Sequence, residues 1–225
     1  MKTASRRSER GSTSAVDEAP VFQTSDLTRE RDLWTIWKQT RRIKDSPFNV
    51  KSTLTISTAL CLYAFYSAEP TPILAQHVRD WSDMGLNLAT ALLGFLIAGF
   101  TIFCTLIKPA LFLEMAKRTD RTTGLSYLKT TLFNFMKAFA VFLVFITACV
   151  LVKLFAGAGG GVSTLIDHLP TYADDSKRYL AEIGIVFVGT FFFYLVVMVK
   201  SFIYNVYHAI MTSLRWEAEY PEGLK

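Results

Sequence analysis

Few residues of this chain could carry out chemistry, and they are scattered. Residues 124–128 (GLSYL) begin like the serine turn of an α/β-hydrolase but lack its second glycine, and the general base would have to be His208. A serine at this place is better explained as the start or cap of a helix, so Ser126 is not expected to be a nucleophile. We therefore expect no enzymatic activity.

Metal binding is not indicated either. His77 lies near Asp80 and Asp83, and His168 follows Asp167. A metal site needs three or four converging ligands, and neither group shows a recognisable spacing. Solvated loops explain both groups, so no metal and no cofactor is expected.

Long apolar segments dominate the chain instead. Hydrophobic residues make up 51% of the sequence, charged residues only 19%, and the mean hydropathy is +0.30. Residues 87–107 contain no charged residue, and as a helix they would be about 30 Å long, the thickness of a bilayer core. Similar segments occupy about 52–68, 132–155 and 183–199. The sequence predicts an all-α membrane protein with four transmembrane helices over residues 48–215.

Lysine and arginine are distributed unevenly between these segments. Eleven precede the first span, one lies between the first and second, five between the second and third, two between the third and fourth, and three follow the fourth. This alternation is the one that the positive-inside rule gives for four spans with both termini in the cytoplasm. The net charge of +5 is thereby explained without direct binding of nucleic acid.

The parts outside the spans differ in kind. Residues 1–24 are polar and predicted to be disordered, and residues 216–225 form a short tail. Residues 25–46 are predicted to form an amphipathic helix in the membrane interface, or alternatively a helix packed on a protein partner. Residues 200–215 are expected to extend the fourth span as one helix into the cytoplasm. The interfacial candidates are Trp34, Trp37, Arg41, Arg42 and Lys44.

One face of the second span carries only small, hydroxyl or amide side chains. They recur at intervals of four and three residues, which keeps them on one side of a helix. In lipid, helices associate where small residues let backbones approach. We expect this surface, called the small-residue stripe, to pack on a helix of the same chain or of another copy, or to line a pore. It consists of Asn87, Ala91, Gly94, Ala98, Thr101 and Thr105.

Lys137 and Lys153 are the charged residues inside the long apolar segments. Each lies close to the end of its segment, so its ammonium group can reach the interface by snorkelling. The alternatives are that they line an anion-favouring oligomeric pore or that they pair with Glu182.

Residues 92–106 (LLGFLIAGFTIFCTL) and 124–129 (GLSYLK) resemble segments of small multi-pass membrane proteins of bacteria. Some proteins of that kind are effectors of anti-phage systems of the retron or cyclic-nucleotide-signalling type. The resemblance implies an effector of the inner (cytoplasmic) membrane that a cytoplasmic protein or ribonucleoprotein holds silent until it is released.

Two functions are therefore expected as alternatives. In the first, the protein is an oligomerising effector that perturbs membrane integrity or potential during abortive infection. In the second, it is a membrane anchor or assembly subunit that recruits a cytoplasmic partner and forms no pore. In both, membrane lipid and further copies of the chain are the expected partners.

Overall fold

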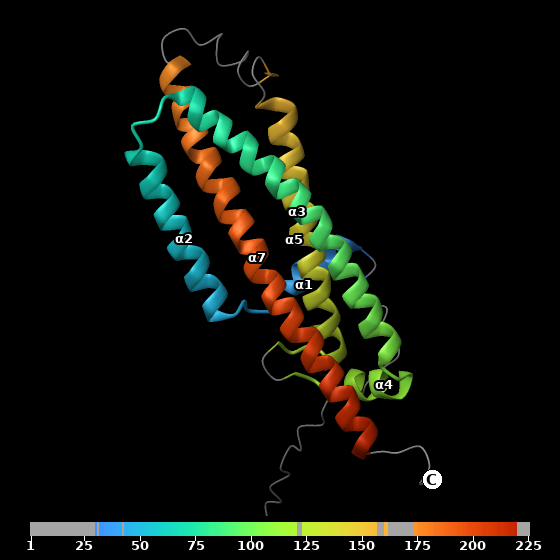
Figure 1. Cartoon of the computed structure of the whole chain (residues 1–225). Coiled ribbons are helices and arrows are strands. Elements are labelled where there is room, and N and C mark those ends of the chain that lie inside the picture. The colour runs from blue at the N-terminus through green and yellow to red at the C-terminus, as the bar shows by residue number, and fades with distance from the viewer. Residues whose placement is uncertain are drawn as a thin grey trace, which may run out of the picture.

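The computed structural model describes residues 30, 32–41, 43–120, 123–156, 160–161 and 173–219. Every regular element in these ranges is an α-helix, as predicted. The order is α1 (Leu33–Thr40), α2 (Pro47–Tyr66), α3 (Thr71–Leu106), α4 (Pro109–Lys117), α5 (Tyr127–Phe155) and α7 (Ala173–Glu219). The four long helices lie side by side in an elongated bundle, and the short α4 lies near the C-terminal end of α7 (Figure 1).

The helix starts follow simple local rules. Helices α2, α3 and α4 each carry proline in the first turn, where its missing N–H costs nothing. Ser126 caps α5, because its hydroxyl oxygen accepts a hydrogen bond from the Lys129 N–H at 3.3 Å. The capping role expected for this serine is thus confirmed. Gly124 in the preceding turn has a φ of 69°, a conformation that glycine adopts without strain.

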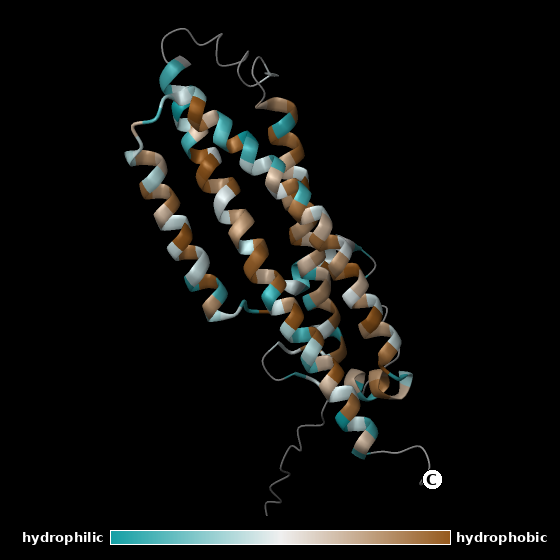
Figure 2. Cartoon of the chain, in the orientation of Figure 1, coloured by the Kyte–Doolittle hydropathy of each residue, from teal (hydrophilic) through white to brown (hydrophobic). Residues whose placement is uncertain are grey.

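Three helices are long and apolar enough to cross a membrane: α3, α5 and most of α7. Hydrophilic residues gather at both ends of α7 and in the first turns of α3 (Figure 2). Helix α7 is continuous over 47 residues, about 70 Å at 1.5 Å per residue. The expected extension of the fourth span as one helix is confirmed, and it reaches Glu219 instead of ending at residue 215.

Helix α2 has the length of a span but not the same apolar character. It has 20 residues, yet it is not among the helices that are apolar enough to cross a membrane. Several of its hydroxyls are bonded within the helix. Ser52 donates to the Phe48 carbonyl at 2.7 Å, and Thr55 donates to the Lys51 carbonyl at 3.0 Å. The structure therefore establishes three candidate spans, and the fourth stays a proposal.

The outer loop predicted between the first two spans, over residues 69–86, is wrong from residue 71 onward. Residues 71–86 form the first turns of α3. Leu74, Val78, Ser82 and Gly85 are buried there, and their spacing places them on one face of the helix. The charged residues between them, which suggested a loop, lie on the other sides. This part of α3 is an amphipathic helix that continues the apolar span.

The amphipathic helix predicted over residues 25–46 is shorter than expected. Asp32 is extended and the helix ends at Thr40, while residues 43–46 connect it to Pro47 at the start of α2. Helix α1 packs on α5. The rest of the predicted helix before Leu33, apart from residues 30 and 32, and the tails 1–24 and 220–225 lie outside the described residues.

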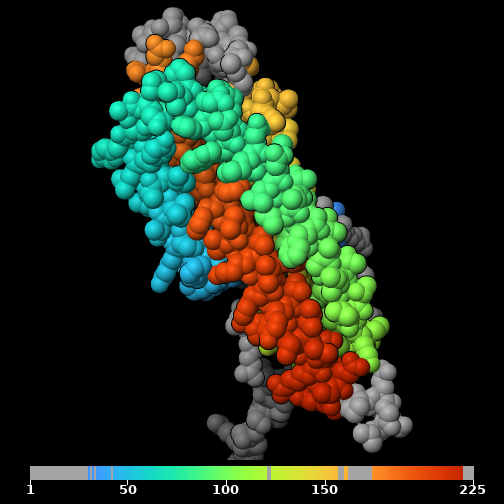
Figure 3. Space-filling view, in the orientation of Figure 1, coloured from blue at the N-terminus to red at the C-terminus, as the bar shows by residue number. Residues whose placement is uncertain are grey.

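The core is formed mainly by aromatic side chains of α3, α5 and α7. Phe135 contacts Phe103 and Phe202 at ring-centroid distances of 4.9 and 5.2 Å. A second, smaller cluster joins Ala64 of α2 to Ile185 of α7 and to the start of α3. Helix α7 packs on α2, α3 and α5 and lies between α2 and α3 in the space-filling view (Figure 3). It is the helix around which the bundle is organised.

Candidate functional site

The small-residue stripe of α3 faces away from the rest of the chain. All six of its residues are exposed, whereas Ala89, Leu96 and Phe103 on the same helix are buried. Gly94 and Leu96 are two residues apart, which is about 200° around a helix. The stripe therefore lies opposite the face that packs on α5 and α7.

The glycines of α3 show the same contrast. A Cβ atom added at Gly85 would lie 2.8 Å from Cζ of Phe145, but one added at Gly94 would meet nothing within 4 Å. The hydroxyls of Thr101 and Thr105 donate to backbone carbonyls of their own helix at 2.9 and 3.0 Å. The sequence left open whether the stripe packs on a helix of the same chain or of another copy. Among the described residues, no helix of the same chain packs on it, so the first possibility is excluded there.

Large apolar side chains border the stripe on both sides. Phe95, Ile97 and Ile102 are each about half exposed, at 51%, 52% and 49%. A helix surface with small residues along its middle and bulky residues beside them lets a second helix approach closely. The outward face of α3 thus has the form of a helix-packing surface without a partner.

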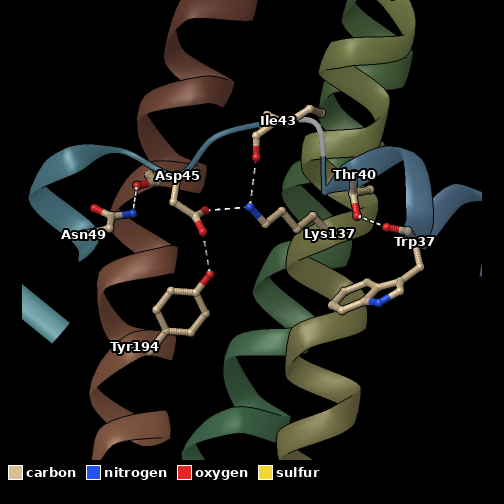
Figure 4. A network of polar contacts seen from close by, with 8 residues as sticks. Trp37, Thr40, Ile43, Asp45, Asn49, Lys137 and Tyr194 are labelled. Atoms are coloured by element: carbon tan, nitrogen blue, oxygen red, sulfur yellow. Dashed lines mark hydrogen bonds and ion pairs between the residues drawn. The ribbon is translucent and has the colours of Figure 1, made fainter. Parts of the chain in front are cut away.

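A polar network lies where α1, α2, α5 and α7 meet (Figure 4). Lys137 Nζ contacts Asp45 Oδ1 at 2.6 Å and the Ile43 carbonyl at 3.4 Å. The Tyr194 hydroxyl donates to the other oxygen of Asp45 at 3.4 Å, and Asn49 donates to the Ser201 hydroxyl at 2.7 Å. Lys137 is only 15% exposed, so a carboxylate, and not snorkelling alone, compensates its charge.

At the opposite end of the bundle, the alternative in which a lysine pairs with Glu182 is wrong. Glu182 is 3% exposed and binds Arg178 at 2.8 Å. Lys153 pairs instead with Asp83 at 2.8 Å, and both side chains are about half exposed. Asp83 was assigned to a loop, but it lies on α3. Arg178 also donates to the Ser67 carbonyl at 2.7 Å, so it ties the turn after α2 to α7.

A groove of about 990 Å³ lies between α4, the start of α5 and the extension of α7. Asn205, His208, Thr212 and Arg215, which repeat along one side of α7, line it. A hydrogen bond to Glu219 and the charge of that carboxylate raise the pKa of Arg215 above its ordinary value. Lys108, in the segment before α5, binds Glu217 of the extension at 2.9 Å, so the two segments are joined by an ion pair beside the groove.

The residues considered for catalysis or metal binding do not form a reactive centre among the described residues. His208 packs against the rings of Tyr204 and Tyr207 at 4.3 and 5.8 Å, and His77 pairs with Glu69 at 3.3 Å. No three metal-ligating side chains converge in the part of the chain that the structure describes. His168 lies outside that part.

No family model matches this chain, and no curated protein or solved structure is similar to it.

The predicted interfacial residues are divided between two environments. Trp34 is 64% exposed, with Lys38 Nζ 5.9 Å from its ring centre, while Trp37 packs against the aromatic core. Arg41 and Lys44 are exposed, and Arg42 lies outside the described residues. Only part of the predicted set is thus exposed, at Trp34, Arg41 and Lys44.

Sequence reasoning missed the acidic partners of the α5 lysines. Lys129 binds Glu30 at 2.8 Å in a pair that is 14% and 8% exposed, and Lys137 binds Asp45. The two lysines are eight residues apart and share one side of α5, and their partners flank α1. The spacing of the two lysines could be seen in the sequence, but no local pattern indicated acidic partners 99 and 92 residues away.

Proposed function

We propose that the protein is a non-enzymatic membrane protein that assembles with copies of itself through the small-residue stripe of α3. The assembled form perturbs the integrity or potential of the inner membrane. The observation that supports this proposal is the outward orientation of the stripe. Self-association would cover the face that the described residues of the chain leave open, because close approach of helices in lipid depends on small residues.

The proposal includes α2 as a fourth span and both termini in the cytoplasm. Asn49 of α2 is bonded to Ser201 of α7, and near its other end Ala64 packs in the cluster that contains Ile185. Helix α2 therefore accompanies α7 along the whole of its apolar part. Hydroxyls bonded within α2 reduce the cost of placing it in lipid, since unsatisfied polar groups are costly there.

The anti-phage role belongs to the same proposal and rests on the resemblance of residues 92–106 and 124–129 to bacterial effectors. A cytoplasmic protein or ribonucleoprotein would hold the protein silent. The extension of α7 offers a surface for such a partner, because residues 200–219 continue the helix for about 30 Å beyond its uncharged part.

Leucine substitutions along the stripe test self-association. Gly94→Leu and Ala98→Leu should shift the purified protein towards monomer in multi-angle light scattering and abolish depolarisation in cells that carry a membrane-potential dye. Cys104→Leu is the matched control, because Cys104 is exposed on the same helix but outside the stripe. Unchanged mass and unchanged depolarisation in both stripe variants would exclude the stripe as the interface.

The groove at the end of α7 favours the second candidate function, a membrane anchor that recruits a cytoplasmic partner. Its lining combines polar side chains, such as Asn134 of α5, with apolar ones, such as Leu111 and Met115 of α4, and this combination is suited to an amphipathic protein segment. The dye experiment separates the two candidates. An anchor should cause no depolarisation, either alone or when its natural partner is triggered.

A further inference from the structure

We infer that a pocket bounded by the end of α1, the following linker, α5 and α7 binds one anionic membrane lipid. The pocket has a volume of about 490 Å³. It is lined by the cationic Arg41 and Lys44, by Trp37, and by the apolar Val141, Val144 and Phe191. The inference depends on the membrane location of the bundle but not on self-association through α3.

The pocket extends from the boundary of the apolar layer into it. Lys137 marks this boundary on α5, because residues 138–152 carry no charge, and Lys200 marks it on α7, because residues 183–199 carry none. Val144 lies about two turns beyond Lys137, and Phe191 lies between two and three turns from Lys200. One end of the pocket is therefore at headgroup level and the other at the level of acyl chains.

The mouth of the pocket carries uncompensated positive charge. Arg41 and Lys44 are exposed, and neither has a carboxylate partner among the described residues. The third cation of the pocket, Lys137, is already paired with Asp45 (Figure 4). An anionic phosphate headgroup would supply the missing charge, as polybasic segments next to a membrane do with acidic lipids.

The inner wall of the pocket fits an acyl chain. Val144 is 54% exposed although it lies within a span, so lipid must cover it. Trp37 stands beside the boundary, where indole rings are favoured. A soluble phosphate compound would use only the cationic mouth, whereas a lipid uses the mouth and the apolar wall together. This combination assigns the pocket to a lipid.

Native mass spectrometry of the full chain in detergent tests the assignment. The probes are phosphatidylglycerol, phosphatidylcholine with the same acyl chains, and glycerol 3-phosphate as a headgroup without chains. We expect one tightly bound phosphatidylglycerol, with binding at least about tenfold weaker for the other two probes. Equal retention of phosphatidylcholine, or equal binding of glycerol 3-phosphate, would overturn the inference.

Two matched pairs of variants locate the site. Arg41→Gln with Lys44→Gln should weaken phosphatidylglycerol binding about tenfold. Lys38→Gln with Lys51→Gln removes the same charge from exposed residues outside the pocket and should leave binding within twofold. Equal weakening in both double variants would mean that the surface attracts acidic lipid without a site.

The second pair probes the acyl wall. Val144 and Leu143 are both 54% exposed, but only Val144 lines the pocket. Val144→Trp should weaken phosphatidylglycerol binding at least fivefold, and Leu143→Trp should not. Val144→Asn, which changes polarity with little change in size, gives the same test if the larger residue impairs folding. Equal affinities across the pair would refute the acyl wall.

Discussion

At Gly189, α7 packs closely against both α2 and α3. A Cβ atom at this position would lie 2.7 Å from Cζ3 of Trp81 on α3 and 2.8 Å from Cδ1 of Leu60 on α2. Gly189 is itself buried, so the added methyl group could not turn away. Gly189→Ala must therefore displace the side chains of Trp81 and Leu60.

The size of the effect follows from two opposing terms. Overpacking a close contact costs about 1–3 kcal/mol, and two contacts below 3.0 Å place Gly189→Ala in the upper half, about 2–3 kcal/mol. Replacing glycine by alanine in a helix gains about 1 kcal/mol in backbone entropy. Gly94→Ala gains the same entropy without any contact, so the difference between the two variants isolates the packing cost.

Thermal unfolding in detergent, followed by the circular dichroism of the helices, measures this difference. At about 2–4 °C per kcal/mol for a chain of this length, Gly189→Ala should unfold about 4–12 °C below Gly94→Ala. Adding Leu60→Ala to Gly189→Ala should recover part of the loss, because one of the two contacts is then removed. Equal midpoints for the two single variants would show that α2 and α3 do not meet α7 at Gly189.

Three further predictions concern polar groups of the bundle. Asp45→Asn should lower the free energy of unfolding by about 1–3 kcal/mol, since its lysine partner is 15% exposed. Asp83→Asn should lower the free energy of unfolding by less than about 1 kcal/mol, because its partner Lys153 is 49% exposed. If Asp83→Asn lowered the thermal midpoint more than Asp45→Asn, these pairings would be contradicted. Arg178→Gln should lower the free energy of unfolding by about 2–3 kcal/mol, because it leaves the buried Glu182 unpaired. It should also make the turn after α2 more sensitive to limited proteolysis; unchanged cleavage would argue against the contact between Arg178 and that turn. Thr55→Val removes only a hydrogen bond within α2, so stability should change by less than about 0.5 kcal/mol, and a larger loss would point to a partner outside the helix.

The apolar runs predicted the helical class and the three helices that are apolar enough to cross a membrane, because lipid requires long uncharged segments. The first turns of α3 were missed for the same reason. They lie beyond the long apolar run, and their buried residues Leu74 and Val78 recur at a helical spacing between charged ones. A search for amphipathic periodicity next to each span, in addition to hydropathy, would have found them.

The orientation of α3 could not be predicted. Small residues occur on both of its faces, with Gly85 and Ala89 towards the core and Gly94 and Ala98 away from it. In water, polarity would separate the two faces, but in lipid both are apolar, so the pattern carries no such signal. The partners of Lys137 and Lys153 were hidden for a different reason, because side chains on separate helices are brought together only by the fold.

The unbroken length of α7 gives the molecule a mechanical property. Because 47 residues form one helix, the chain contains a stiff lever of about 70 Å, held between α2 and α3 near Gly189. Glu219 lies about 45 Å along the helix from Gly189, so a tilt of about 5° around Gly189 would move the tip at Glu219 by about 4 Å. A partner that bound in the groove near Trp216 and tilted α7 would therefore also change the packing of α7 on α2 and α3.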